Sequence, residues 1–506
     1  MSKKETFINL FVSVASNIVI LVMGLVIPRV FLTHFGSDTN GLISTISQIF
    51  AYVALLEAGI SQATTNALYK PLRECNQKDT ITVLCASRKY YRKVTHVYAV
   101  VVVVLAFILP LTIKSSLDYK TIFLVVLFEG AAGVVSFYFV QTQSILLTAD
   151  GKAYIKSSIE LIIKVLGYGA KIVLALLDMN IVYIQFAFFV LSLLKLTLYK
   201  IIMKKKYSWI DYSECTNTKF SLPNRKDFIV SELAWTVFSS TDLIILSFFA
   251  STQMASVYSV NNMLFLAVNS MLSAAYYAIY YMLGKAYYSG IEKYTKVHDV
   301  FNSFFIGAIT LLISVAVLLS DAFIMIYTSG VKDIQYNWYW LPLGFGLIQL
   351  LSWSRYIPGN LTGIAGYARQ VSRISLFEAI VNLILSIVLV NKFGVYGVVF
   401  ATIIVLPIKV IYTNYISDKV IMKRSCKNTI YILLANYIVF GVTIYLRFKI
   451  VISIHNFIDF ILYGMFLTLI YGFIIGGVNI VVNHNLRILL QNYWTDIRDK
   501  MLLRKK

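Results

Sequence analysis

Residues 155–177 read IKSSIELIIKVLGYGAKIVLALL, a mostly apolar stretch that carries charges at its centre. A length of about 20 apolar residues is enough for an α-helix to cross a bilayer. A charge at the bilayer centre costs about 2.5–3.5 kcal/mol on insertion scales, so such residues normally have a task there. At 100° per residue, Glu160, Lys164 and Lys171 fall on one helix face. We interpret this face as the lining of a water-filled cavity.

A purely structural interpretation of the same face stays open. Glu160 and Lys164 are four residues apart, so they would meet on a helix and neutralise each other. Lys171 would still need a partner of its own. Gly167 and Gly169 lie between the two lysines, and their small size would let a ligand or another helix approach closely.

The composition indicates one membrane-embedded unit. Hydrophobic residues make up 58% of the 506 residues and charged residues 14%, whereas about 25% of an ordinary soluble domain is charged. Fourteen segments have the length and apolar character of a membrane-spanning helix, and several of them contain internal Gly, Asn, Ser or Pro. They are residues 7–31, 41–69, 94–113, 121–147, 155–177, 181–202, 228–249, 258–284, 300–320, 338–360, 370–390, 394–417, 430–447 and 457–482.

The distribution of positive charge predicts the orientation. With fourteen spans both termini lie on one side, and 33 of the 45 Lys and Arg residues fall in loops on that side. Six fall in loops on the other side and six inside spans. Because cytoplasmic loops are enriched in Lys and Arg, we expect both termini in the cytoplasm. The net charge of +21 then reflects topology, and no nucleic-acid partner is expected.

A weak internal repeat relates the two halves of the chain. Phe35-Gly-Ser aligns with Phe249-Ala-Ser, Lys195 aligns with Lys409 at the same offset, and Glu160 aligns with Glu378 at a slightly larger one. The repeat predicts two pseudo-symmetric six-helix lobes with a substrate site between them, plus a C-terminal helix pair. The predicted boundaries are 1–202 for the N-terminal lobe, 203–227 for a basic cytoplasmic linker, 228–417 for the C-terminal lobe, 430–482 for the helix pair and 483–506 for a cytoplasmic amphipathic tail.

The run NIVILVMGLVIPRVFLTHFGSDTNGLISTISQIFAYVALLEAGISQATTNALYKPL (residues 17–72) carries a resemblance to a known family. Its elements are Pro28-Arg29, Phe35-Gly36 followed by Asn40-Gly41, and Glu57-Ala-Gly59. The run resembles the bacterial Wzx/PST-type polysaccharide flippases. These belong to the MOP superfamily, which also contains the MATE multidrug exporters and the lipid II flippase MurJ.

This resemblance implies a two-lobed transporter that works by alternating access in the bacterial cytoplasmic membrane. The cargo would be an undecaprenyl-diphosphate-linked oligosaccharide, moved from the inner to the outer leaflet for surface polysaccharide biosynthesis. The expected partners are this substrate, membrane lipids, an H⁺ or Na⁺ counter-ion and polysaccharide synthesis proteins.

Four cationic side chains are candidates for binding the diphosphate: Arg29, Lys164, Lys171 and Arg355. Arg suits phosphate by its bidentate fork and Lys by its point charge. Arg29 and Arg355 have an alternative as interfacial residues that snorkel, and Arg355 also has a candidate partner in Glu378. For Lys195 and Lys409, at the inner ends of their spans, snorkelling is the better interpretation.

The acidic residues within spans are Glu57, Glu129, Glu232, Asp242 and Glu378. A transporter coupled to H⁺ or Na⁺ needs a carboxylate that changes access, and Asp242 and Glu378 are the candidates, with Glu160 as a further cavity carboxylate. No enzyme motif, phosphate-binding loop or metal-ligand spacing occurs, so neither a catalytic residue nor a cofactor is expected. The four cysteines lie in segments expected to be cytoplasmic, where thiols stay reduced.

Two other functions remain as alternatives. A MATE-like multidrug exporter would need an acidic cavity for cationic drugs, whereas the buried charge here is mainly positive. A membrane polysaccharide polymerase or ligase typically has a large outer loop with catalytic Arg or His, and the longest outer connection, residues 321–337, is short.

Overall fold

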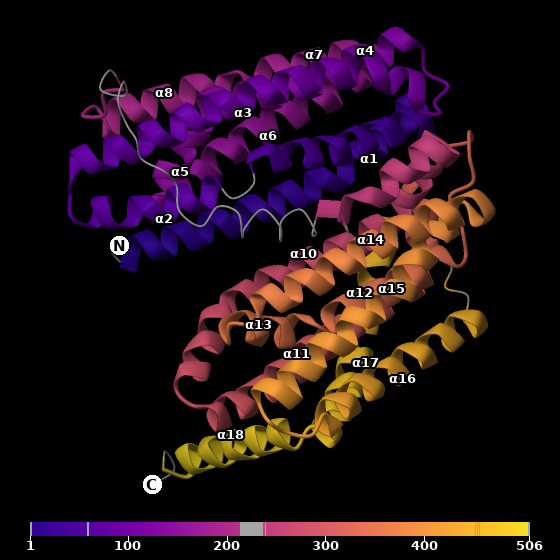
Figure 1. The fold of residues 1–506 in the computed structure, drawn as a ribbon. Coiled ribbons are helices and arrows are strands. Elements are labelled where there is room, and N and C mark those ends of the chain that lie inside the picture. Colours follow the sequence, from indigo (N-terminus) through magenta and orange to yellow (C-terminus); the bar gives the residue numbers. More distant parts are fainter. Residues whose placement is uncertain are drawn as a thin grey trace. The chain divides into compact units, whose positions relative to one another are not determined.

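The computed structural model describes residues 3–57, 60–212, 236–237, 239–450, 452, 454 and 456–503. Within these ranges every regular element is a helix (Figure 1), which confirms the predicted all-α class. The chain forms two compact units, which we name the N-unit (Met1–Ser256 with Gly330–Ile334) and the C-unit (Val257–Ser329 with Gln335–Lys506). The predicted lobe boundaries stay a prediction, because most of the linker 203–227 lies outside the described residues.

The N-unit is built from one very long helix and a series of shorter ones. They are α1 (Lys3–Ala54), η1 (Leu55–Glu57), α2 (Ile60–Arg73), α3 (Gln77–Thr112), α4 (Tyr119–Phe139), α5 (Gln141–Ala149), α6 (Ala153–Leu176), α7 (Ile181–Ser192) and α8 (Leu194–Lys206). A short apolar helix, Ser239–Ala250, follows, and its end is the π-helix η3 (Leu246–Ala250).

The C-unit takes up the rest of the chain. Its helices are α10 (Thr252–Tyr288), whose first residues belong to the N-unit, α11 (Ile291–Tyr327), α12 (Leu341–Trp353), α13 (Tyr356–Ile364), α14 (Ala368–Phe393), α15 (Val395–Tyr415), the π-helix η4 (Ile416–Ile421), α16 (Lys427–Lys449), α17 (Phe457–Val482) and α18 (His484–Leu503). Helix α18 lies in the predicted tail.

Each of the fourteen predicted spans overlaps a helix in the part of the chain that is described. Nine described helices are long and apolar enough to cross a membrane by themselves, and one of these, Ile18–Glu57, runs through the first two predicted spans. Other spans are broken within the predicted segment, as at Val140 between α4 and α5. Helix α6 has 24 residues, but its central charges interrupt its apolar surface.

The helix boundaries repeat along the chain as the sequence offset predicts. The break at Val140 and the break at Ser354 are separated by the same offset as Lys195 and Lys409, and the helix that follows each break has nine residues. Helices α7 and α15, which begin at Ile181 and Val395, are related by that offset as well. Equivalent interruptions at equivalent places support the predicted pseudo-symmetry of two six-helix halves.

Helix α1 changes direction within the family-like motif. Gly36 has φ +78°, a left-handed conformation that strongly favours glycine. The adjacent Ser37 donates from its backbone N–H and its hydroxyl to the Asp333 carboxylate, at 2.6 and 2.7 Å. Gly41 lies against the start of α10, where a Cβ atom would be 1.7 Å from the Thr252 carbonyl oxygen. The glycines therefore serve a sharp bend and a close helix contact.

Polar side chains of this motif hold the bend in place. Asp38 accepts hydrogen bonds from Ser115 Oγ at 2.9 Å and from Ser116 N at 2.6 Å, and it also accepts one from Thr252 Oγ1. Asn40 donates to Ser256 Oγ at 2.8 Å, and both residues are buried. The motif thus joins α1 to the α3–α4 connection and to the start of α10.

Replacing Asn40 by alanine is expected to destabilise the N-unit by about 1–2 kcal/mol, because a buried side-chain hydrogen bond is lost. Thermal unfolding of the purified protein in detergent measures this. Asn391→Ala is the matched control, because Asn391 is exposed near the end of α14 and its amide donates to the carbonyl of Ile387 within its own helix. Equal melting temperatures for the two variants would contradict the role given to Asn40.

The third element of the motif lies at the end of α1. Gln141 Nε2, at the start of α5, donates to Glu57 Oε2 at 3.2 Å. Ala58 and Gly59 lie outside the described residues, as does Glu232. Glu57 is therefore engaged with the neighbouring helix α5.

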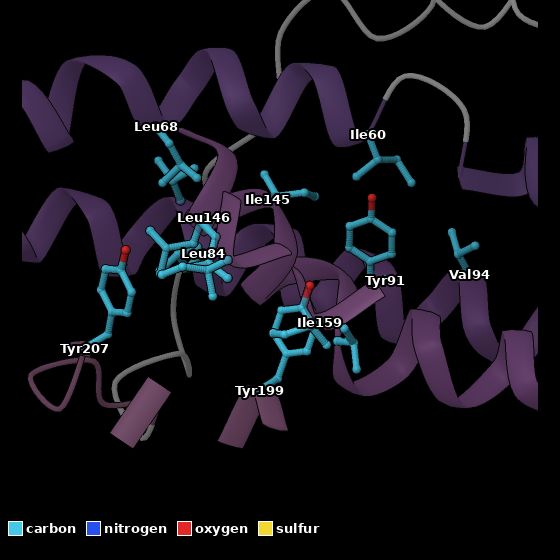
Figure 2. Packing of buried hydrophobic residues seen from close by; sticks show 14 of the residues in the cluster. Ile60, Leu68, Leu84, Tyr91, Val94, Ile145, Leu146, Ile159, Tyr199 and Tyr207 are labelled. Atoms are coloured by element: carbon cyan, nitrogen blue, oxygen red, sulfur yellow. The ribbon is translucent and has the colours of Figure 1, made fainter. Parts of the chain in front are cut away.

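An apolar core positions one end of α6 in the N-unit (Figure 2). Ile159 and Ile163 of α6 pack in a cluster with Tyr91 of α3 and Tyr199 of α8. Leu146 of α5 also belongs to this cluster. Because these isoleucines point into the cluster, the neighbouring Glu160 and Lys164 are directed to a different side of α6.

The C-unit is held together by buried polar groups around α11. Asn479 of α17 accepts hydrogen bonds from Ser303 of α11 and Asn436 of α16, each at 3.0 Å. Arg424, in the connection before α16, makes ion pairs with Asp299 and Asp418 at 2.7 Å. In a bilayer such interhelical hydrogen bonds replace the hydrophobic effect as a source of specific packing.

The cysteines differ from expectation. Cys75 and Cys426 are free, but Cys85 lies within α3, is buried, and is disulfide-bonded. From the sequence, Cys85 is expected in a cytoplasmic segment, where thiols stay reduced. Disulfide formation depends on the spatial distance between two sulfur atoms, which spacing along the chain does not show.

Candidate functional site

A cavity of about 350 Å³ lies within the N-unit, between α4, α6, α7 and α8. Its charged lining consists of Glu160 and Lys164 from α6 and Lys195 from α8. Ser136 of α4 and Phe188 of α7 are further lining residues. The Glu160–Lys164 part of the α6 face therefore borders this cavity.

The cavity carries an excess of positive charge. Lys195 Nζ donates to Ser136 Oγ at 3.2 Å, and the ammonium lies within electrostatic range of Glu160 and Lys164. Among the described side chains, Glu160 and Lys164 form no ion pair with each other. Two lysines and one glutamate give the lining a formal charge of +1. This arrangement suits an anion, and hydroxyls such as that of Ser136 add neutral hydrogen-bonding capacity.

The position of Lys195 differs from the snorkelling position that the sequence favours. It lies near the start of α8 and contributes to the cavity instead of snorkelling to the interface. Lys195 lies in the first turn of α8, directly after the break between α7 and α8 at Leu193. The alignment of Lys195 with Lys409 was the sequence signal that pointed to it.

Lys171 lies on the same helix as Lys164 but is covered. Its side chain is 6% exposed, and its Nζ is 3.9 Å from the centre of the Phe188 ring and 5.9 Å from that of Phe31. Glu129 of α4 is within electrostatic range and accepts a hydrogen bond from Gln185 at 3.1 Å. Lys171 therefore has a cation–π partner and a nearby carboxylate, and it does not line the cavity.

Arg29 and Asp242 are in the N-unit but away from the cavity lining. Arg29 is half-buried on α1, and its backbone carbonyl accepts a hydrogen bond from the Thr33 hydroxyl at 3.0 Å. Asp242 is buried close to Tyr52, whose hydroxyl is hydrogen-bonded to Thr241 and donates to the Val237 carbonyl at 3.2 Å. The structure thus separates these two predicted site residues from Lys164.

Arg355 and Glu378 form a buried ion cluster in the C-unit. Arg355 Nη1 donates to Glu378 Oε1 and Oε2 at 2.6 and 2.9 Å, and Lys409 Nζ lies 3.4 Å from Oε2. Glu378 is 1% exposed and Arg355 is 7% exposed. The predicted Arg355–Glu378 pair is present. Lys409 belongs to it as well, so it does not snorkel as the sequence suggested.

The sequence offset aligns the two charge clusters with each other. At the offset that relates Lys195 to Lys409, Glu378 corresponds to Lys164 rather than to Glu160, with which the sequence repeat aligned it at a slightly larger offset. Lys195 and Lys409 correspond as the repeat predicted. At equivalent positions, the N-unit has two lysines beside a cavity, whereas the C-unit has a carboxylate held between two cations.

The fold is similar to solved transporter structures. A multidrug resistance MATE family transporter of the MOP superfamily, in an inward-facing conformation, matches with a TM-score of 0.64 and 12% identity over 82% of this chain and 99% of its own. The lipid II flippase MurJ, in an inward closed conformation, matches with a TM-score of 0.66 and 14% identity over 92% of this chain and 98% of its own.

A third similar structure is the MATE multidrug transporter DinF-BH, with a TM-score of 0.57 and 14% identity over 84% of this chain and 98% of its own. No protein-family model and no curated protein sequence matches the chain. At these identities the likeness concerns the fold alone. The chain is a multi-pass helical membrane protein with the fold of MOP-superfamily transporters.

Proposed function

We propose that this protein is a flippase that moves undecaprenyl-diphosphate-linked oligosaccharide from the inner to the outer leaflet of the bacterial cytoplasmic membrane. The observation that carries the proposal is the basic cavity within a membrane-spanning helix bundle, lined by Lys164 and Lys195. A diphosphate is a compact anion, and lysines at a partly desolvated site bind it through charge-assisted hydrogen bonds. The fold shared with MurJ and the Wzx/PST-like motif at Asn40-Gly41 support the same class of cargo.

The size of the cavity agrees with a site for the head group. About 350 Å³ is at the lower end of the volumes of small-molecule sites. Such a volume holds a diphosphate, whereas the sugars and the isoprenoid chain would extend beyond it. The lipid-facing surface of the bundle would solvate the isoprenoid, because exposed apolar side chains such as Leu166 and Ile162 occupy the outer face of α6.

Glu160 is the carboxylate that we assign to ion coupling, because it faces the lysines that would hold the anion. Protonation of Glu160 would raise the formal charge of the lining from +1 to +2 and strengthen anion binding. Glu378 is held by two cations, and Asp242 lies elsewhere in the N-unit, so neither has this relation to the cavity. Transport would proceed by alternating access, with both termini in the cytoplasm.

The function is tested in a strain that lacks the gene. We expect undecaprenyl-diphosphate-linked repeat units to accumulate in the inner leaflet and surface polysaccharide to disappear, with both restored by the wild-type gene. The measurement is mass spectrometry of extracted lipid-linked intermediates together with surface-polysaccharide staining. Normal surface polysaccharide in the deletion strain would overturn the proposal.

A MATE-like multidrug exporter is the second candidate, because an inward-facing MATE structure shares the fold at a TM-score of 0.64, close to the 0.66 of MurJ. A cationic drug would meet a lining with a formal charge of +1, which opposes its entry. The same deletion strain decides between the two functions, since increased retention of a cationic dye with unchanged lipid-linked intermediates would indicate drug export.

A further inference from the structure

Phe188 lies between two lysines of one helix face. On one side its ring lines the cavity that also contains Lys164 and Lys195. On the other side it covers Lys171, whose Nζ is 3.9 Å from the ring centre. Lys164 and Lys171 are seven residues apart, which is about 10 Å along an α-helix. A single aromatic ring therefore separates a solvent-accessible lysine pair from a third, covered lysine.

The packing of Phe188 on α6 depends on a missing side chain. A Cβ atom at Gly167 would lie 2.8 Å from Cδ2 and Cε2 of the Phe188 ring, so only glycine lets the ring rest at this depth. The ring is also stacked on Tyr168, with a centroid distance of 6.3 Å and an interplanar angle of 10°. Gly169, two residues further on, has no atom within 4 Å of its ideal Cβ position. The missing side chain at Gly167 therefore leaves the space that the Phe188 ring occupies, whereas no neighbouring atom occupies the space at Gly169.

The partner of the Lys171 ammonium at short distance is an aromatic ring rather than an anion. Lys171 is buried and is attracted by Glu129, although the two form no ion pair among the described side chains. The Glu129 carboxylate already accepts a hydrogen bond from Gln185. An aromatic face stabilises an ammonium less than a phosphate does, because a phosphate offers full charge and several acceptor oxygens. An anion that reached Lys171 would therefore replace the ring as its partner.

We propose that Phe188 is a gate between two successive anion positions, an inner one at Lys164 and Lys195 and an outer one at Lys171. This inference rests on the proposed function and names a positioning residue for it. With the cytoplasmic topology, α6 runs outward from Ala153, so Lys171 lies nearer the outer leaflet than Lys164 does. Rotation of the Phe188 ring away from Lys171 lets a diphosphate pass from the first position to the second.

Amine labelling tests directly whether Phe188 covers Lys171, and it needs no substrate. The purified wild-type protein in detergent is treated with an amine-reactive reagent, and each lysine is quantified by peptide mass spectrometry. We expect Lys171 to react about tenfold or more slowly than Lys164 and Lys195, and Phe188→Ala to bring its rate close to theirs. Gly167→Ala should also speed the labelling of Lys171, whereas Gly169→Ala, the matched control, should leave it unchanged. Phe188→Leu keeps an apolar side chain at the site and replaces Phe188→Ala if that variant does not fold.

Binding of inorganic pyrophosphate tests the second position. In Phe188→Ala three lysines are available together, so we expect pyrophosphate to bind about tenfold more tightly than to the wild type. The additional substitution Lys171→Gln should remove that gain. Fast labelling of Lys171 in the wild type, or a gain that survives Lys171→Gln, would overturn the gate. Absence of any pyrophosphate binding by the wild type would instead count against the flippase proposal, and the labelling result would still decide whether Phe188 covers Lys171.

Discussion

Replacing Lys164 and Lys195 together by glutamine is expected to lower transport at least 100-fold while leaving membrane insertion intact. The double substitution changes the formal charge of the cavity lining from +1 to −1, because Glu160 remains. Each charged hydrogen bond to a phosphate contributes about 1.5–3 kcal/mol, so the loss of two corresponds to two or more orders of magnitude in affinity. Glutamine keeps a polar side chain of similar size at each position, so the fold should persist.

The measurement is export of lipid-linked repeat units in the deletion strain, combined with pyrophosphate binding to the purified protein. Lys200→Gln is the matched control, because Lys200 is exposed on the same helix as Lys195. Glu160→Gln removes a charge of the opposite sign from the same cavity and should tighten pyrophosphate binding. Surface polysaccharide at the wild-type level in the double variant would show that the cavity does not hold the anion.

Glu378→Ala is expected to destabilise the C-unit by about 3–5 kcal/mol, because it leaves Arg355 and Lys409 buried together without their carboxylate. Two like charges would then lie close to each other in a region of low dielectric. Thermal unfolding in detergent measures the effect. A change as small as that of an exposed substitution would contradict the geometry of this cluster.

A triple replacement separates the structural role of the cluster from a role in transport. The variant Arg355→Met/Glu378→Leu/Lys409→Met removes all three charges and keeps similar volume. Replacing a complete buried ion cluster by apolar side chains is often neutral or stabilising, so this variant should unfold near the wild-type temperature or above it. If it also exports normally, the cluster is structural. Loss of export in a stable triple variant would return Glu378 to the candidates for ion coupling.

The helices were predictable because their signal is local. A run of about 20 apolar residues satisfies its own backbone hydrogen bonds in a bilayer only as a helix, whatever its neighbours are. The breaks were less predictable. Gly36 can be suspected from its residue type. Leu193 and Val140, which end α7 and α4, have no feature that marks a break. Val140 and Ser354 are nevertheless equivalent positions in the repeat.

The site was predicted in part because one of its components is also local. Glu160 and Lys164 face the cavity as their 100° spacing on α6 indicates. The other components come from different helices, so no sequence pattern links them. The sequence pattern favours the interface for Lys195, gives no signal for Phe188, and predicts Lys171 in water, although Phe188 covers it.

The sequence by itself determined that this chain crosses a membrane many times as helices, that its halves repeat, and that positive charge is buried on the helix that became α6. These properties follow from composition and period, which each segment carries independently. Only the tertiary structure decided which buried charges are neutralised. Arg355 has a carboxylate within 2.6 Å, whereas Lys164 borders open space. The reason is that electrostatic and cation–π partners are set by distances between helices, and such distances are not encoded in the period of any one helix.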